Sequence, residues 1–408
     1  MMKKIKILHL VGGPLTAGAF KGSLILHKSL LNLGIDSKIL NDRPPSDIKY
    51  LSKKDAENLI FVNKNFFRII LNRLFVILEK TFNTFFLKAP RSTFTLGFLG
   101  FDLTKFKEYD DADLIHIHWL GKGFIKLSSI KKIKKPVVWT MRDMWTFSGG
   151  SHYTSDFKEF EKGLISKIIK NYKKGIYSEK IQFIAISNWL KKRATESQIL
   201  KNSNLKIIHN NIDLENFYPL DKEKARSLLN ISTTKKIILY GAQNPQSPRK
   251  GWSIFLETLG NLDKSKYLIL IFGNFWSKAS LDQIGIEYKS FGFVNDKNLL
   301  NAIYSSSDMF IFPSIQEAFG KTWAEAMACG LPIVCFNNTS ASDYISHRVN
   351  GFVVDDINAK DLKKGIEWVS KKIDEKKDFK NLSRNQIEKF DPKIIAQQYI
   401  KIYSEICS

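Results

Sequence analysis

The stretch MFIFPSIQEAFGKTWAEAMACGLPIVCF, residues 309 to 336, predicts two buried strands joined by a short helix. The apolar runs at its two ends have strand length and contain no polar residue, as expected for parallel strands covered on both faces. The helix begins near Gly320 and ends before Gly330 and Pro332. A strand, a helix and a second strand of this kind are typical of doubly wound α/β domains.

Two carboxylates lie inside this stretch, Glu317 before the helix and Glu325 within it. The backbone amides of Phe319, Gly320 and Lys321 lie at the predicted helix N-terminus, where unpaired donors and the helix dipole favour a phosphate. Glu325 would then be placed to accept hydroxyls of a ribose, and Glu317 those of a sugar. The alternative is a solvated Glu317 and a surface Lys321–Glu325 pair worth only ~0.2 to 0.5 kcal/mol.

Strand-like runs alternate with helical patterns along the whole chain, which predicts an α/β fold with parallel sheets. The predicted strands are residues 4 to 10, 37 to 41, 113 to 119, 136 to 141, 181 to 187, 236 to 242, 267 to 273, 309 to 313 and 332 to 336.

The chain of 408 residues, 44 % of them hydrophobic, is long enough for two cores. We predict a first domain of residues 1 to 205 and a second domain of residues 206 to 390, with a hinge in the polar segment 207 to 220. An amphipathic helix at 391 to 406 is able to pack back on the first domain.

Cysteine usage and the N-terminus indicate a cytoplasmic protein. Cys329, Cys335 and Cys407 have no paired spacing, so neither a disulfide framework nor a zinc site is predicted. The start, MMKKIKILHLVGG, is broken by charged and polar residues and leads into glycines, so we interpret it as a strand and not as a signal peptide.

The net charge of +23 is unevenly placed. Residues 1 to 200 carry 35 Lys and Arg against 17 Asp and Glu, whereas residues 201 to 408 carry 28 against 23. A basic domain beside a nearly balanced one indicates an anionic partner, with a general lysine bias as the alternative. No nucleic-acid-binding motif is recognisable, so an anionic membrane surface is the predicted partner and nucleic acid is not.

The most apolar region, residues 66 to 87, is interrupted by charged side chains. It therefore lacks the ~20 uninterrupted apolar residues of a membrane span, and no integral membrane protein is predicted. Two interpretations of this aromatic, amphipathic run stand: it dips into a membrane interface, or it forms ordinary core and a lid.

A second cluster of polar residues follows the strand predicted at 236 to 242. The loop QNPQSPRKGW supplies Arg249 and Lys250, and Gly251 opens the next helix. Two cations at such a junction can neutralise a diphosphate and stabilise it as a leaving group. A solvated basic turn is the alternative.

These motifs together resemble glycosyltransferase family 4, a family of retaining enzymes with the GT-B fold. The second half resembles its nucleotide-sugar domain through GFVNDKNLL (292 to 300), IYSSSDMFIFPS (303 to 314), EAFGKTWAEAMACGLPIV (317 to 334) and NGFVV (350 to 354). The first half resembles it through GGPLTAGAFKGSLILHKSLLNLGIDSKIL (12 to 40), DLIHIHW (113 to 119) and KPVVWTMRDMWTFSGGSHY (135 to 153). The last of these is similar to bacterial capsule and exopolysaccharide transferases.

The resemblance implies two Rossmann-like domains that face each other across a cleft, with an E-x7-E motif in the second. Glu317 matches the acid that holds donor-sugar hydroxyls, and Glu325 matches the acid that holds the ribose. The backbone of residues 319 to 321 matches positions that face the sugar and the diphosphate. Lys250 matches the diphosphate lysine.

Further donor-binding positions follow from the same resemblance. Phe293 and Val294 fall where the base is usually met, and Gly18 falls in the glycine-rich loop that approaches the donor phosphates and the acceptor. The family often has an arginine where this chain has Ala242, so Arg249 is expected to supply that charge.

Arg142 is a second departure, because the family often has a histidine at this position. An arginine is effectively always protonated and cannot act as a general base. Arg142 is therefore a candidate for binding the acceptor phosphate or the donor sugar, with Asp143 and His152 nearby. His118, at the carboxyl end of its predicted strand, is a further cleft candidate.

No metal site is predicted. His116 and His118 alternate along one strand and point to the same face, but no third ligand follows at a suitable spacing. The acidic triplet 111 to 113 resembles a metal motif of another transferase class, yet it precedes a strand in a turn. We expect chemistry without a metal or other cofactor.

The resemblance implies a retaining glycosyltransferase that moves a hexosyl unit from a UDP- or GDP-sugar to a lipid-linked or polysaccharide acceptor. Such an enzyme would act in capsule, exopolysaccharide or lipopolysaccharide synthesis, at the inner face of the cytoplasmic membrane. Two alternatives stay open: a nucleotide-sugar epimerase of the same architecture, and a catalytically weak binding protein, which Arg142 suggests.

Overall fold

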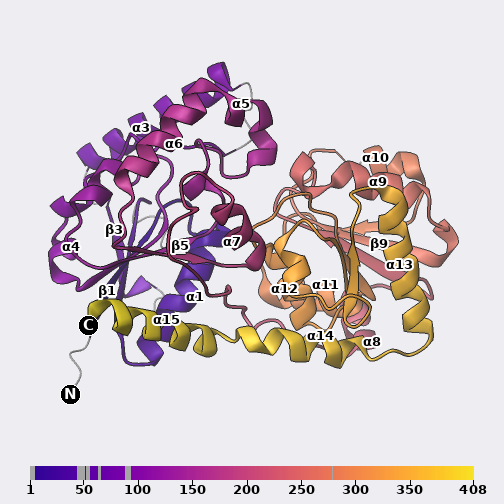
Figure 1. The fold of residues 1–408 in the computed structure, drawn as a ribbon. Coiled ribbons are helices and arrows are strands. Elements are labelled where there is room, and N and C mark those ends of the chain that lie inside the picture. The colour runs from indigo at the N-terminus through magenta and orange to yellow at the C-terminus, as the bar shows by residue number, and fades with distance from the viewer. Residues whose placement is uncertain (1–4, 44–50, 52–55, 63–65, 88–92, 278) are drawn as a thin grey trace. The chain divides into compact units, whose positions relative to one another are not determined.

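The computed structural model forms two compact units, shown as ribbons in Figure 1. The described residues are 5–43, 51, 56–62, 66–87, 93–277 and 279–408. The first unit comprises Met1–Asn211 and Pro392–Ser408, and the second comprises Ile212–Asp391. The boundary between Asn211 and Ile212 lies inside the polar segment 207 to 220, whereas the sequence places the division at 205 and 206.

The described part of the first unit holds a seven-stranded parallel sheet in the order β3-β2-β1-β4-β5-β6-β7. Its strands are β1 (Lys6–Val11), β2 (Asp36–Asn41), β3 (Leu59–Phe61), β4 (Leu114–Trp119), β5 (Val137–Met141), β6 (Ile181–Ala185) and β7 (Leu205–Ile207). The strand order reverses between β1 and β4, and ligands of doubly wound sheets bind at the carboxyl ends of strands near such a point.

The helices of the first unit include one from the far end of the chain. They are α1 (Gly18–Asn32), α3 (Phe66–Phe86), α4 (Lys107–Asp111), α5 (Lys158–Lys162), α6 (Leu164–Ile176), α7 (Asn188–Thr195) and α15 (Pro392–Cys407). Short 3₁₀ turns lie at Leu103–Lys105, Leu127–Lys132, Trp145–Phe147 and Thr154–Phe157. Helix α15 packs against α1, so the last residues belong to the same unit as the first.

The described part of the second unit holds a six-stranded parallel sheet in the order β10-β9-β8-β11-β12-β13. Its strands are β8 (Lys236–Gly241), β9 (Tyr267–Phe272), β10 (Tyr288–Ser290), β11 (Met309–Phe312), β12 (Ile333–Phe336) and β13 (Gly351–Val354). Its helices are α8 (Lys222–Leu228), α9 (Trp252–Gly260), α10 (Ala279–Ile284), α11 (Lys297–Ser306), α12 (Lys321–Ala328), α13 (Ala359–Asp374) and α14 (Phe379–Ile387). Its 3₁₀ turns are Pro248–Lys250, Lys264–Lys266, Ser340–Asp343 and Glu388–Phe390.

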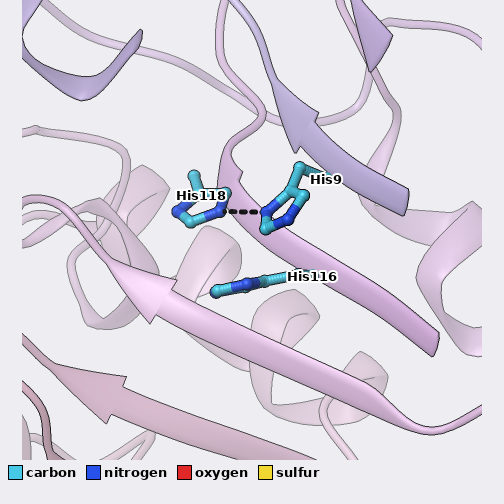
Figure 2. A group of neighbouring side chains, drawn as sticks. All are labelled: His9, His116 and His118. Atoms are coloured by element: carbon cyan, nitrogen blue, oxygen red, sulfur yellow. Dashed lines mark hydrogen bonds between the residues drawn. The ribbon is translucent and has the colours of Figure 1, made fainter. Parts of the chain in front are cut away.

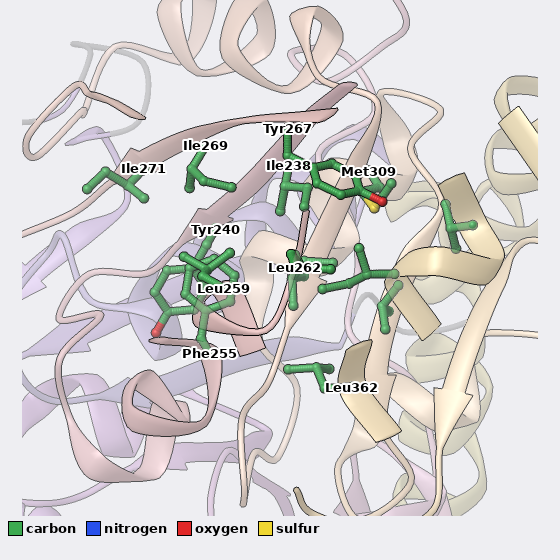
Figure 3. Packing of buried hydrophobic residues seen from close by; sticks show 14 of the residues in the cluster. Ile238, Tyr240, Phe255, Leu259, Leu262, Tyr267, Ile269, Ile271, Met309 and Leu362 are labelled. Atoms are coloured by element: carbon green, nitrogen blue, oxygen red, sulfur yellow. The ribbon is translucent and has the colours of Figure 1, made fainter. Parts of the chain in front are cut away.

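The core of the second unit fixes the strands that carry the predicted donor residues. Figure 3 shows Ile238 and Tyr240 of β8 packed with Ile269 of β9 and Phe255 of α9. Leu362 of α13 joins the same buried cluster from the other end of the unit's sequence. Burial of these side chains contributes ~25 cal/mol per Å² of apolar surface, which holds β8 and its following loop in place.

All nine strands predicted from the sequence are present, with ends that differ by no more than two residues. The edge strands β3, β7, β10 and β13 are not among the predicted strands, because three or four residues are too few to show a period of two. None of the helices in the described ranges combines the length and apolar character that crossing a bilayer requires.

Candidate donor site and a buried histidine network

Helix α12 begins after Gly320, as predicted, and Gly320 has a positive φ of 81°. A Cβ at this position would lie 2.5 Å from the Phe312 ring and 2.9 Å from Trp323, so only glycine fits. The carbonyl of Phe319 accepts a hydrogen bond from the indole N–H of Trp323, and the Phe319 side chain is buried. These contacts fix the loop before α12, so the first amides of the helix, starting at Lys321, have a defined position.

The loop after β8 approaches this turn through a second glycine. Gly251 has a φ of 69°, and a Cβ on it would lie 1.8 Å from the carbonyl oxygen of Pro313. The amide of Ile315 donates to the carbonyl of Arg249 at 2.8 Å. These close backbone contacts bring the Pro248–Lys250 turn against the loop that follows β11.

Glu317 is the meeting point of the two loops. Its Oε2 accepts a hydrogen bond from Arg249 Nη1 at 2.9 Å and another from Lys250 Nζ. Arg249 Nη1 also donates to the carbonyl of Gln316 at 2.8 Å. Only 6 % of Glu317 is exposed. The structure thus joins three residues that the sequence singled out separately, Arg249, Lys250 and Glu317, which we call the Glu317 cluster. Two cations and one carboxylate give this cluster a net positive charge, which favours binding of an anion.

Glu325 lies within α12 and is held by a residue that the sequence analysis missed. Its Oε2 accepts a hydrogen bond from the hydroxyl of Tyr304 in α11 at 2.9 Å. Burial, together with the Glu325 charge, raises the pKa of Tyr304 well above its usual range, so this hydroxyl stays a donor. Tyr304 lies inside the motif IYSSSD, but nothing in the local pattern indicated which way its side chain points.

Phe293 and Val294 follow β10 and belong to an exposed loop. The preceding Gly292 has a φ of 64°, and its carbonyl accepts the amide of Gly273 at 2.7 Å, which ties the loop to the end of β9. Phe293 is 51 % exposed. An exposed aromatic face of this kind is suited to stacking on a planar group.

In the first unit, Arg142 follows β5 and is held by three side chains. Its Nη2 donates to Ser23 Oγ at 3.1 Å and to His118 Nδ1 at 2.9 Å, and its Nη1 donates to Asn210 Oδ1. Since a guanidinium can only donate, His118 Nδ1 must be an acceptor. Burial lowers the pKa of His118 well below its usual range, and the charges of His116 and Arg142 add to the shift, so His118 is neutral.

The protonation of His118 fixes that of His9. With Nδ1 accepting, the proton of His118 lies on Nε2, which donates to His9 Nδ1 at 2.9 Å, the dashed line in Figure 2. His9 therefore carries its own proton on Nε2, an atom that has no hydrogen-bond partner among the described residues. His9 faces His116 across the β1–β4 pair, so a register argument would have found it.

His9, His116 and His118 form a group whose ring nitrogens lie within 4.8 Å of one another, so a distant strand supplies the third histidine that the spacing around His116 and His118 did not show. All of these ring nitrogens except the protonated His9 Nε2 nevertheless have hydrogen-bond partners. His116 bonds the hydroxyls of Tyr403 and Thr140 at 2.7 and 2.8 Å, and the lone pair of His118 accepts from Arg142. The lone-pair nitrogen of each ring already has a hydrogen-bond partner, and the guanidinium of Arg142 bonds His118, so these residues fit a neutral hydrogen-bond network better than a metal ion.

Asp143 and His152 are joined to each other and not to Arg142. Asp143 Oδ2 lies 2.7 Å from His152 Nδ1, while its Oδ1 accepts the amide of Trp145 at 2.9 Å. Lys173 of α6 supports the same turn by donating to the carbonyls of Trp145 and Ser148, and burial lowers its pKa to about 7. His152 is buried, so this pair braces the turn that follows β5.

Two family models match the chain. Residues 48–216 match the model described as Glycosyltransferase Family 4, and residues 221–386 match the model described as Glycosyl transferases group 1. The chain belongs to the glycosyltransferases that these two models describe. Its two parallel-sheet units are those of the GT-B fold, as the resemblance implied.

Relatives of this glycosyltransferase include a protein from a cps region and a named glycosyltransferase. It is 27 % identical over 335 residues, 78 % of this chain and 86 % of that protein, to an uncharacterized 41.2 kDa protein in the cps region of Klebsiella pneumoniae. It is 25 % identical over 270 residues, 63 % and 68 % of the two chains, to the N,N'-diacetylbacillosaminyl-diphospho-undecaprenol alpha-1,3-N-acetylgalactosaminyltransferase of Campylobacter jejuni. Anabaena Alr3699/HepE in complex with UDP-glucose has the same fold, with a TM-score of 0.69, 18 % identity and coverage of 98 % and 100 %.

Gly18 is the remaining predicted residue, and in this glycosyltransferase it is the first residue of the long helix α1. It is exposed, and no atom lies within 4 Å of the position that a Cβ would take. The preceding Ala17 provides no side-chain cap for the first amides of α1. The predicted residues of the first unit therefore divide into an exposed helix start and the buried network around Arg142.

Proposed function

We propose that this glycosyltransferase moves a hexosyl unit, with retention of configuration, from a UDP- or GDP-sugar to a lipid-linked or polysaccharide acceptor of a surface glycan. The observation that carries the donor assignment is the Glu317 cluster, in which Arg249 and Lys250 meet one carboxylate beside the start of α12. Two relatives support the acceptor class, because one is named for a diphospho-undecaprenol substrate and the other comes from a cps region.

The donor would be held by side chains and amides of the second unit. Lys250 and Arg249 would take the diphosphate, with the first amides of α12 beside them. Glu317 would accept hydrogen bonds from sugar hydroxyls once Arg249 and Lys250 bind the phosphates. Glu325 would accept the ribose hydroxyls, with its carboxylate oriented by Tyr304. The exposed Phe293, with Val294, would meet the base.

The chemical step would need orientation and charge stabilisation more than a protein base. The acceptor oxygen attacks the anomeric carbon on the face from which the nucleotide leaves, and the bond from that carbon to the phosphate oxygen breaks. The departing phosphate oxygen takes the acceptor proton, so a nucleoside diphosphate is released. Arg142 fits this scheme, since an arginine at the histidine position removes a base that the step does not use.

Arg142 would instead present a fixed cation to a phosphate of the acceptor. Ser23, Asn210 and His118 hold its guanidinium in one orientation, which reduces the entropy lost when an anion binds. We propose that no metal ion is needed, because Arg249 and Lys250 already supply positive charge at the diphosphate. The reaction would take place in the cytoplasm, at the membrane that carries the acceptor.

Transfer assays with a panel of UDP- and GDP-sugars test the proposal. The first variant is Lys250→Gln, and its matched control is Lys235→Gln, which removes a lysine from a surface ion pair of the same unit. We expect Lys250→Gln to lower turnover by ~10²-fold or more, as loss of one charge-stabilising donor does, while the control stays near wild type.

Unchanged turnover in Lys250→Gln would contradict the donor assignment. NMR of the product gives the anomeric configuration, and an inverted product would contradict the retaining mechanism. An epimerised donor formed without any acceptor would replace the proposal with the epimerase alternative.

A further inference from the structure

Helix α3 turns an apolar stripe to the solvent. Seven large apolar side chains on it are between 47 % and 77 % exposed: Phe66, Phe67, Ile70, Leu74, Ile77, Leu78 and Phe85. Most are separated by three, four or seven residues, so they share one face of the helix. Because these side chains are exposed, the interpretation of this run as ordinary core was wrong for this stripe. A contiguous exposed apolar face of this length marks an interaction site.

The opposite face of α3 packs inward with apolar and polar side chains: Phe75 and Phe82 contact the rings of Phe101 and Phe94, and two polar residues are buried beside them. Asn72 is 8 % exposed and donates to the carbonyl of Gly123 at 3.2 Å. Glu79 is 3 % exposed, and burial raises its pKa to about 7 against the opposing effect of nearby backbone amides. A rotation that buried the stripe would break the Asn72 bond, so packing fixes the stripe outward.

Helix α6 also carries exposed apolar side chains. Its Leu164, Ile165 and Ile168 are exposed. The next residue, Ile169, lies in a buried cluster against which Phe82 of α3 packs, so the two helices are neighbours, as Figure 1 also shows. We call the exposed apolar residues of both helices the α3–α6 surface.

The charges on these helices are of one sign. Arg73 and Lys80 on α3 and Lys167 and Lys174 on α6 are exposed. The only acid in the two helices, as described, is the buried Glu79. Apolar side chains flanked by cations without exposed acids complement a surface of apolar chains under anionic headgroups.

We propose that the α3–α6 surface docks on an anionic lipid bilayer, with the apolar stripe in the headgroup and acyl boundary and the four cations on lipid phosphates. A helix of 21 residues is ~32 Å long, enough to lie flat along the interface. Pairing with a second copy of the chain is disfavoured, because it would oppose cations to cations. The inference deepens the proposed function and rests on it for its setting, since a lipid-linked acceptor lies in such a bilayer.

Vesicle sedimentation of the full chain tests the proposal, with phosphatidylglycerol mixed into phosphatidylcholine and with phosphatidylcholine alone. We expect binding to the anionic vesicles at low salt and much weaker binding to the neutral ones. The double variant Ile70→Gln/Ile77→Gln should bind at least tenfold more weakly. Its control is Leu228→Gln, which removes an even more exposed apolar side chain from α8 of the second unit.

A charge variant tests the second part of the surface. Replacing Arg73, Lys80, Lys167 and Lys174 by glutamine should also weaken binding at least tenfold and remove its salt dependence. The matched control replaces four exposed lysines of the second unit, Lys224, Lys266, Lys360 and Lys371, by glutamine.

Three results would overturn the proposal: no binding of wild type to anionic vesicles at low salt, unchanged binding of the stripe variant, or a dimer in solution that the stripe variant dissolves. Transfer to a water-soluble acceptor analogue, measured on the same preparations, separates the two proposals. Transfer without vesicle binding would contradict only the proposed membrane docking. Stripe-dependent vesicle binding without transfer from any sugar nucleotide would contradict only the proposed reaction.

Discussion

Gly251 is the residue on which the approach of the two donor-site loops depends. Its backbone lies in the left-handed region, and the Pro313 carbonyl occupies the place where a side chain would begin. The contact positions Arg249 and Lys250 at Glu317, so a residue with no functional group of its own decides where two cations lie. The charge of the Glu317 cluster follows from this backbone contact.

We predict that Gly251→Ala destabilises the second unit. The left-handed conformation alone costs a residue with a Cβ ~1 to 2 kcal/mol, and the contact with Pro313 adds to that loss. The control is Gly260→Ala at the end of α9, where no atom lies within 4 Å of the added Cβ and where alanine is the better helix former.

Urea denaturation of both variants measures the difference, and donor binding should weaken only in Gly251→Ala. A Gly251→Ala protein as stable as Gly260→Ala would show that the close approach to Pro313 is not required.

Helix α3 illustrates what an element presents to its two sides. Its apolar stripe is visible in the sequence, but the same periodicity fits a helix that buries the stripe and a helix that exposes it. The buried Asn72 and Glu79 decide between the two. Because Glu79 lies on the inward face, the orientation of α3 also has a consequence for the dependence of stability on pH.

We predict that Glu79 makes the first unit less stable as the pH rises from about 4.5 to about 7. The pKa of Glu79 is raised by burial from 4.5 to about 7 in the folded protein, so the unfolded chain loses this proton first. The unfavourable contribution is absent below pH 4.5 and complete above pH 7, where it reaches ~3 kcal/mol at ~1.4 kcal/mol per pH unit.

The variant Glu79→Gln should therefore be more stable than wild type at pH 8 and similar to it near pH 4.5. Thermal unfolding across this pH range measures the effect. The exposed Glu159→Gln is the control and should follow the wild-type profile. Parallel profiles for Glu79→Gln and wild type would show that the carboxyl is not buried.

At the scale of the whole molecule, the last helix of the chain, α15, belongs to the first unit. Tyr399 of α15 bonds Thr140 Oγ1 at 2.8 Å, and Tyr403 bonds His116 Nδ1 at 2.7 Å. The carboxyl-terminal residues thereby supply hydrogen-bond partners to Thr140 and His116, and the His116 ring packs against that of His118, which bonds Arg142. The second unit, in contrast, is continuous in sequence and has its own core.

We predict that truncation after Asp391 destabilises the first unit selectively. Loss of α15 exposes its apolar partners and leaves the polar groups of Thr140 and His116 without their hydroxyl partners, at ~1 to 3 kcal/mol for each group that stays buried. Calorimetry should show one transition lowered and the other unchanged.

Phe255→Ala, in the core of the second unit, is the matched comparison and should lower the other transition. A truncated chain in which both transitions fall together would contradict the assignment of α15 to the first unit.

Much of this fold could be predicted from the sequence because its signals are local. Buried parallel strands are short apolar runs, and the start and end of α12 are marked by Gly320 and Gly330. The donor motif is local as well, since Glu317, the turn and Glu325 lie within nine consecutive residues. These features need only backbone propensity and burial, and they are present in any window that contains them.

The tertiary structure decided what depends on strand order, register and the direction of a helix face. His9 reaches His118 because β1 and β4 are neighbours in the sheet, although a long stretch of chain separates them. Arg249 and Lys250 meet Glu317 because β8 and β11 are neighbours in the other. The sequence by itself determined which side chains carry charge, protons or apolar surface, whereas their partners came from packing, because contacts between distant residues form only when the sheets and their helices have assembled.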